Sequence, residues 1–266
     1  MEKKRKIFTI NLYGYLNEEK AKVCKEYQDH NREVIESDEF VSKKYEYTQV
    51  NENNEVNEFV NSSECILSSL PKKYYYQLIS DLVRYKYMID NPDSIYLDTD
   101  FCMFGKLAVK HLIKINTDCI VNNRDALIGE INKNRIFPCN WLMIGGGKQV
   151  GSTTIFEDMY NLLKERLTVN SYENYVFSPS ISKWTSKVED YIWTELWGYA
   201  IPMKLDSRKF SFINYEHYQA NEWNKDWRDA NVMKPNELYG CHFFGFGEGG
   251  RPDWKEFVKY HNLHIK

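Results

Sequence analysis

The chain has 266 residues, 42% of them hydrophobic and 15% aromatic, which is enough for one large domain or two small ones. Its formal net charge of -3 excludes the global basic field typical of proteins that bind nucleic acid or anionic membranes. Six scattered cysteines without C-x-x-C spacing, and a start too short and polar for a signal peptide or membrane span, predict a cytoplasmic protein.

The first part of the chain predicts a strand, a helix and a second strand. Residues 6–13 are β-branched and aromatic up to the breaker Gly14, which is typical of a strand. Residues 17–29 have a helical pattern with acidic residues in the first turn. Residues 32–38 predict a second strand. Residues 41–62 are polar and lack periodicity, so we expect a long exposed segment with one weak helix.

The clearest element is a helix over residues 72–90. Its apolar residues recur at intervals of four, three and four, which places on one face Leu78, Leu82, Tyr85 and Ile89. Asn91-Pro92 ends the helix, because the residue before a proline avoids helical geometry. A strand over 94–97 follows. This order predicts a single α/β domain with a mostly parallel central sheet flanked by helices.

The rest of the chain predicts more helices and short strands. Helices are expected over 152–167, over 186–197 and after Trp254, and strands over 136–144 and 200–204. No internal repeat, low-complexity tract or linker marks a second domain. The sequence therefore favours one domain over two.

The strand at 94–97 leads directly into two aspartates one residue apart, Asp98 and Asp100. Open α/β sheets bind ligands just beyond the carboxyl ends of their strands. Two carboxylates there are hard oxygen ligands suited to Mg²⁺ or Mn²⁺ bridging a diphosphate. A D-x-D string alone is a weak signal, because a solvated turn has the same residues.

The preceding helix adds a second pair of charges. Asp81 and Arg84 are three residues apart, so they share a helix face and can form a charge-assisted hydrogen bond. The alternative is an exposed pair that contributes little to stability.

Together these residues resemble the sugar-binding region of DXD glycosyltransferases with the GT-A fold. That family includes capsular and outer-chain sugar transferases and, more distantly, the glucosylating clostridial toxins. Its string has the form S-D-x-x-R-[YI], the rest of a helix, often Gly-Gly, then [IM]-Y-L-D-x-D. The matching residues, within a stretch of about 21, are Ser80, Asp81, Arg84, Tyr85, Tyr96, Leu97, Asp98 and Asp100. A longer corner at residues 91–94 replaces the glycine pair.

The resemblance implies a hexose transfer from a UDP- or GDP-hexose to a hydroxyl of a glycan, a lipid-linked sugar or a protein, with retention. It implies that Asp100 binds Mn²⁺ or Mg²⁺, while Asp98 contacts the donor's ribose or sugar and reaches the metal through water. Asp81 and Arg84 would hold hydroxyls of the donor sugar. Peripheral association with a membrane through a lipid-linked acceptor stays open.

Further site residues follow from the same resemblance. Its members take another ligand from the C-terminal part, often a His shortly before a Trp. Here His242 is the expected metal ligand and Trp254, at a longer spacing of twelve residues, a candidate near the diphosphate; a strand histidine without metal is the alternative. Tyr13 would stack on the base. Residues 1–105 would form the nucleotide-sugar half of the domain and residues 106–266 the acceptor half.

Two glycine-rich strings imitate nucleotide-binding motifs. Residues 245–250 spell G-x-G-x-x-G, but too little chain follows for the βαβ unit that this motif needs, so a lid beside Arg251 or a plain loop is expected. Residues 145–154 lack the Lys that a P-loop requires after its last glycine. Neither string indicates a dinucleotide site or a P-loop.

Two other functions stay open from the sequence. One is a non-catalytic carbohydrate-binding protein on a transferase fold, against which the intact Asp81, Arg84, Asp98 and Asp100 argue. The other is a nucleotidyltransferase or phosphohydrolase, which would be expected to show more acidic ligands or basic phosphate clamps. No residue can be assigned as a general base, and the base, the hexose and the acceptor are set by loops that sequence does not fix.

Overall fold

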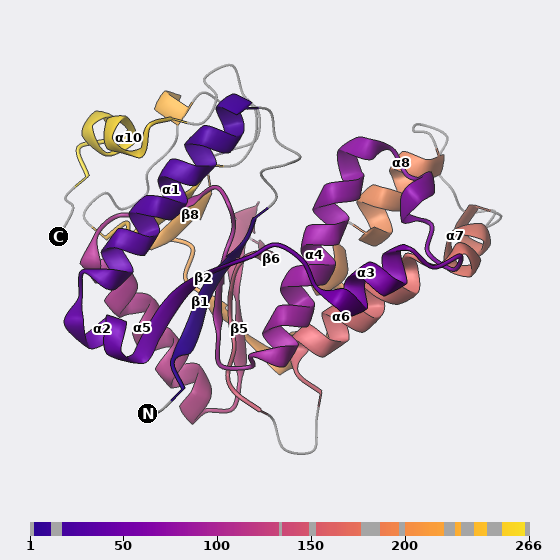
Figure 1. The fold of residues 1–266 in the computed structure, drawn as a ribbon, viewed down its shortest axis with the longest axis horizontal. Helices are drawn as coiled ribbons and strands as arrows, with labels where there is room; N and C mark the ends of the chain where they lie inside the picture. The colour runs from indigo at the N-terminus through magenta and orange to yellow at the C-terminus, as the bar shows by residue number, and fades with distance from the viewer. Residues whose placement is uncertain are drawn as a thin grey trace.

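The computed structural model describes residues 3–11, 18–132, 135–148, 153–176, 187–196, 200–220, 227–229, 237–243 and 252–263. A six-stranded sheet of order β2-β1-β3-β6-β5-β7 forms its centre (Figure 1). The strands are β1 (Arg5–Ile10), β2 (Tyr45–Val50), β3 (Ile95–Leu97), β5 (Asp125–Asn132), β6 (Arg135–Ile144) and β7 (Phe210–Ile213). Three of its five pairings are parallel, and β6 runs antiparallel to β3 and β5. The predicted α/β fold with a mostly parallel central sheet is confirmed.

Helices cover both faces of this sheet (Figure 1). One layer holds α1 (Glu18–Glu36), α2 (Glu39–Lys44) and α5 (Lys106–Val121). The other holds α3 (Asn54–Val60), α4 (Lys72–Asp90), α6 (Ile155–Arg166), α7 (Val169–Val176), α8 (Lys187–Tyr191), a π-helical stretch (Ile192–Leu196) and α9 (Ala200–Met203). Successive strand residues point to opposite faces, so Ile7 and Ile95 pack under the first layer and Phe8 and Tyr96 under the second.

Helix α4 forms over the predicted residues. Leu78, Leu82 and Tyr85 from its apolar stripe are buried in the core between this helix and the sheet. The backbone N–H of Asn91 donates the last helical hydrogen bond, to the Tyr87 carbonyl at 2.9 Å. The helices predicted over 152–167, over 186–197 and after Trp254 also form, at least in part, as does the strand over 136–144.

Three sequence expectations are wrong. Residues 32–38 form no strand, because Val34 and Ile35 belong to helix α1 and bury one helical face against the sheet. Residues 41–62 contain β2 in addition to helices: it pairs with β1 as an edge strand, and its half-exposed residues hide the strand pattern. Residues 200–203 form helix α9 rather than the start of a strand.

A second, three-stranded sheet begins where the chain leaves β3. Its order is β4-β9-β8, with strands β4 (Phe101–Met103), β8 (Tyr218–Ala220) and β9 (Gly240–His242). β4 and β9 are antiparallel, with Phe101 opposite His242. Phe243 packs with Phe257 of α10 (Trp254–Tyr260) beside this sheet. The sheet therefore returns a late segment of the chain to the carboxyl end of β3.

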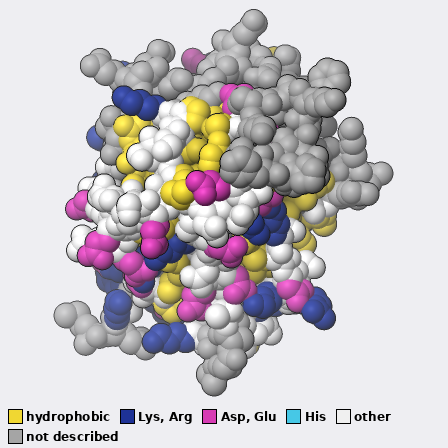
Figure 2. Space-filling view, turned by 90° about the vertical axis from the view of Figure 1, so that its right-hand side faces the viewer, with side chains coloured by type: hydrophobic (Ala, Val, Ile, Leu, Met, Phe, Trp, Pro, Cys, Tyr) yellow, Lys and Arg dark blue, Asp and Glu magenta, His cyan; other side chains and the backbone are white. Residues whose placement is uncertain are grey.

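The surface on the α7 and α8 side mixes side chains of all kinds. Figure 2 shows acidic and basic groups interspersed with apolar ones over the described part of this face. None of the helices that the structure describes is long and apolar enough to cross a lipid bilayer.

Candidate functional site

The two aspartates lie at the junction of the two sheets. The backbone N–H of Asp98 donates to the Trp141 carbonyl at 2.9 Å, which extends the pairing of β3 with β6 by one residue. The Phe101 N–H donates to the Asp98 carbonyl at 3.1 Å, and β4 begins there. On the other side, the Phe243 N–H donates to the Asp100 carbonyl at 2.9 Å. These pairings place His242, the preceding residue of β9, beside both carboxylates.

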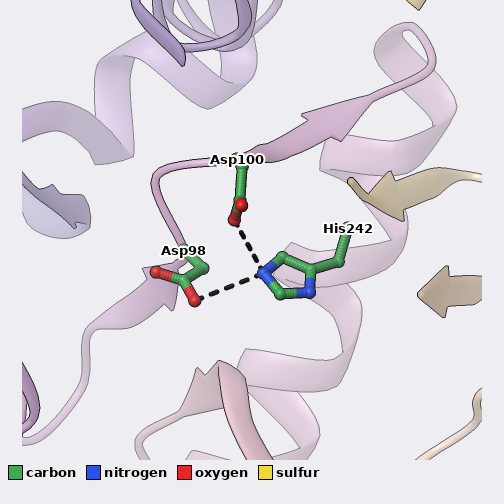
Figure 3. Close-up of side chains that lie close together, drawn as sticks. All are labelled: Asp98, Asp100 and His242. Carbon is green, nitrogen blue, oxygen red and sulfur yellow. Dashed lines mark ion pairs between the residues drawn. The ribbon is translucent and has the colours of Figure 1, made fainter. Parts of the chain in front are cut away.

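Asp98, Asp100 and His242 form one compact group, here called the acidic cluster (Figure 3). His242 Nε2 lies 2.7 Å from Asp100 Oδ1 and 3.3 Å from Asp98 Oδ2. His242 and Asp100 are buried and Asp98 is partly buried. Burial alone would lower the pKa of His242, but the carboxylates of Asp100 and Asp98 raise this pKa to about 9. The two carboxylates therefore require a positive charge between them.

The acidic cluster has the donor set of a divalent cation site. Its three ligand atoms lie within 4.8 Å of one another, and Figure 3 shows both carboxylates directed at the same imidazole nitrogen. Two carboxylate oxygens with one imidazole nitrogen suit Mn²⁺ and, through the oxygens, Mg²⁺. The residues present fit a divalent cation, which Asp98, Asp100 and a deprotonated His242 would hold.

The second oxygen of Asp98 is held by the protein. Asp98 Oδ1 accepts from the Tyr96 hydroxyl at 2.8 Å and from the Thr99 N–H at 3.0 Å, and Arg84 Nη2 lies 3.7 Å away. Burial alone would raise the pKa of Asp98, but the Arg84 charge and the His242 hydrogen bond lower it below its ordinary value. Asp98 is therefore ionised at neutral pH, with one oxygen turned toward His242.

The Asp81–Arg84 pair lies inside the protein. Arg84 Nε is 3.3 Å from Asp81 Oδ1, and each residue is only 6% exposed. The guanidinium also donates to the Asn140 carbonyl at 3.1 Å and to Ser80 Oγ at 3.0 Å. It lies 4.7 Å from the centre of the Tyr96 ring. The alternative of an exposed ion pair is wrong, and Arg84 links helix α4 to the acidic cluster.

Asn140 is a buried residue of this region that sequence reasoning did not identify. From β6, its amide nitrogen donates to Asp81 Oδ1 at 3.0 Å and to the Tyr85 hydroxyl at 2.8 Å. Burial raises the pKa of Asp81 to about 6, although Arg84 and this hydrogen bond act in the opposite direction. The partners of Asn140 lie 55 and 59 positions earlier, so no local pattern could have identified it.

Of the other predicted site residues, the structure describes Trp254 but not Tyr13. Trp254 is the first residue of helix α10, and its ring stacks on His30 of α1 with 3.9 Å between the ring centres. His30 in turn hydrogen-bonds the Met103 carbonyl at 2.9 Å. The structure thus places Trp254 on the α1 side of the small sheet. Tyr13 and residues 245–251 lie outside the described residues.

No protein-family model matches this sequence, and no curated protein sequence matches it either. Three solved structures to which the chain is similar are glycosyltransferases. An enzyme involved in glycosylation of the major capsid of PBCV-1 is 8% identical, with 98% of this chain and 99% of that chain covered and a TM-score of 0.43. The bifunctional glycosyltransferase WbbM, in its apo form, is 11% identical. The match covers 98% of this chain and 50% of that chain, with a TM-score of 0.45.

The third is the galactosyltransferase LgtC in complex with donor and acceptor sugar analogs. It is 10% identical, with 97% of this chain and 95% of that chain covered and a TM-score of 0.43.

Proposed function

We propose that this protein is a metal-dependent glycosyltransferase. It would move a hexose from a UDP- or GDP-hexose to a hydroxyl of a glycan, a lipid-linked sugar or a protein. The observation that carries the proposal is the acidic cluster, which joins two carboxylates and an imidazole at the carboxyl end of β3. A divalent cation at this edge of an α/β sheet is well placed for a nucleoside diphosphate.

The three residues of the acidic cluster would hold the metal ion. When bound, a divalent cation would supply Lewis-acid stabilisation of the leaving diphosphate. Asp98 is kept ionised for this task by Arg84, and the imidazole of His242 would give up its proton on metal binding. Asp100 supplies the second carboxylate. Catalysis would then rest on charge stabilisation and on holding donor and acceptor in register.

The buried polar group beside the cluster is the proposed sugar-binding part. Asp81 and Asn140 present polar atoms there, and Arg84 orients Asp81 through the 3.3 Å contact. The many internal contacts of Arg84 support an orienting role in addition to any hydroxyl that it binds itself. In the same proposal Tyr13 would stack on the base, and Trp254 is a candidate near the diphosphate.

The division of the chain and the stereochemistry in the proposal rest on the sequence resemblance alone. Residues 1–105 would bind the nucleotide sugar and residues 106–266 the acceptor, with configuration retained at the transferred sugar. Mn²⁺ is the preferred ion because the donor set includes an imidazole.

Thermal unfolding with a ligand panel tests the proposal. UDP, GDP and their common hexose conjugates are each added with Mn²⁺ or with EDTA to the wild type, to Asp100→Asn and to the control Asp118→Asn, whose side chain is exposed on α5. A ligand at a hundred times its dissociation constant adds about 2.7 kcal/mol of stability. We expect one nucleotide series to raise the midpoint of the wild type and the control only with Mn²⁺, and not that of Asp100→Asn.

Two results would contradict the proposal. Equal stabilisation of Asp100→Asn and the wild type would remove the metal role from the acidic cluster. If no nucleotide stabilises the wild type while a glycan does, the protein is a carbohydrate-binding protein.

A further inference from the structure

Trp141 of β6 is the point where the large sheet contacts the small one beside the acidic cluster. It is 3% exposed, and its ring contacts those of Phe101 and His242. Phe101 and His242 are opposite each other in the β4–β9 pair. One tryptophan of the large sheet therefore packs against both members of a cross-strand pair in the small sheet, at the residue that supplies the imidazole.

The rings of Trp141 and His242 are stacked and nearly parallel. Their ring centres are 4.9 Å apart and their planes differ by 3°. The last torsion of a histidine side chain is broad and roughly two-fold, so a free imidazole can rotate away from a given direction. Stacking on the indole restricts this rotation. In the resulting plane, Nε2 faces Asp100 at 2.7 Å and Asp98 at 3.3 Å.

The indole is itself fixed. Its Nε1–H donates to Glu130 Oε1 at 2.7 Å, and Glu130 lies on the neighbouring strand β5. The main chain of Trp141 also holds Asp98, whose N–H donates to the Trp141 carbonyl at 2.9 Å. The side chain of Trp141 thus sets the plane of one group of the acidic cluster, and its backbone sets the position of another.

We infer that Trp141 is a positioning residue of the acidic cluster, which presents the His242 nitrogen and the Asp98 carboxylate to a divalent cation. This inference rests on the proposed function, because it assumes that the cluster binds a metal. Replacing a residue that contacts a metal ligand and orients it typically weakens metal binding about 10- to 100-fold. Trp141 would act in this way through ring stacking.

The test measures the Mn²⁺ dissociation constant of the full chain by calorimetry, well below each variant's thermal midpoint. Trp141→Leu removes the stacking face, and we expect about 10- to 100-fold weaker binding. Trp141→Phe keeps an aromatic face but loses the hydrogen bond to Glu130, so a smaller loss is expected. The matched control is Trp227→Leu: Trp227 is 4% exposed and packs on Phe257 of α10. It should lower the midpoint without changing Mn²⁺ affinity.

The outcomes separate the two proposals. If the wild type binds no Mn²⁺, the proposed function fails and this inference falls with it. If the wild type binds Mn²⁺ and both Trp141 variants bind it equally well, only the inference is overturned. A loss of affinity in Trp227→Leu as large as that in Trp141→Leu would also overturn it, because general destabilisation would then explain the effect.

Discussion

Replacing Arg84 with methionine removes a positive charge from a buried network while keeping most of the apolar stem. Arg84 lies 3.3 Å from Asp81 and 3.7 Å from Asp98. Removing one partner of a buried ion pair costs about 3–5 kcal/mol, whereas an exposed pair contributes about 0–1 kcal/mol. Burial already raises the pKa of Asp81 to about 6 despite Arg84. Without Arg84, Asp81 would take up a proton at neutral pH, and we expect the free energy of unfolding to fall by about 3 kcal/mol.

Urea unfolding at pH 7, followed by tryptophan fluorescence, measures this loss. Lys43→Met is the control, because Lys43 and Glu39 form a pair at 2.6 Å whose side chains are 70% and 84% exposed. We expect that control to lose less than about 0.5 kcal/mol. Adding Asp81→Asn to Arg84→Met should recover on the order of 1 kcal/mol, since an amide needs no proton to be neutral at pH 7 whereas Asp81 does. A loss below about 1 kcal/mol in Arg84→Met would refute the reasoning, because the pair would then behave as an exposed one.

Two further predictions concern residues that support the fold around the site. Burial raises the pKa of Asp125 to about 6 from 3.8, so its contribution to the free energy of unfolding falls as pH rises through this interval. Relative to the wild type, the free energy of unfolding of Asp125→Asn, measured with urea, should therefore rise by on the order of 2 kcal/mol between pH 4 and pH 7. A difference between the two proteins that does not change with pH would contradict this prediction. At Gly240 a Cβ would lie 2.5 Å from the Phe101 ring, so Gly240→Ala should displace β9 and His242 with it. We expect Mn²⁺ binding, measured by calorimetry, to weaken about tenfold. Unchanged Mn²⁺ affinity would contradict this prediction.

The sequence predicts best where one physical signal decides the structure. Helix α4 combines a strong apolar stripe with a proline just past its end, and it forms over the predicted residues 72–90. The sequence pattern fails to predict the structure where the same residues are compatible with either a strand or a helix. Val34 and Ile35 favour a strand locally, but they extend helix α1 because that face is buried against the sheet. Strand β2 escapes prediction because an edge strand keeps polar residues on its exposed positions.

The candidate site divides in the same way. Asp98, Asp100, Asp81 and Arg84 lie close together in sequence, so spacing and resemblance single them out. His242 could be suggested only by resemblance, since the pairing of β9 with β4 brings it to the cluster. Asn140 and Trp141 carry no local signal, because their partners come from α4, β5 and β9.

The most direct test of the glycosyltransferase proposal is ³¹P NMR of a panel of UDP- and GDP-hexoses incubated with the protein and Mn²⁺. Water can take the acceptor's place, so the reaction can be followed before the acceptor is known. The proposal predicts that one UDP- or GDP-hexose is converted to the free nucleoside diphosphate, and that EDTA or Asp100→Asn abolishes the conversion. Conversion that continues at the same rate in EDTA and in Asp100→Asn, or no conversion of any donor with the wild type, would contradict it.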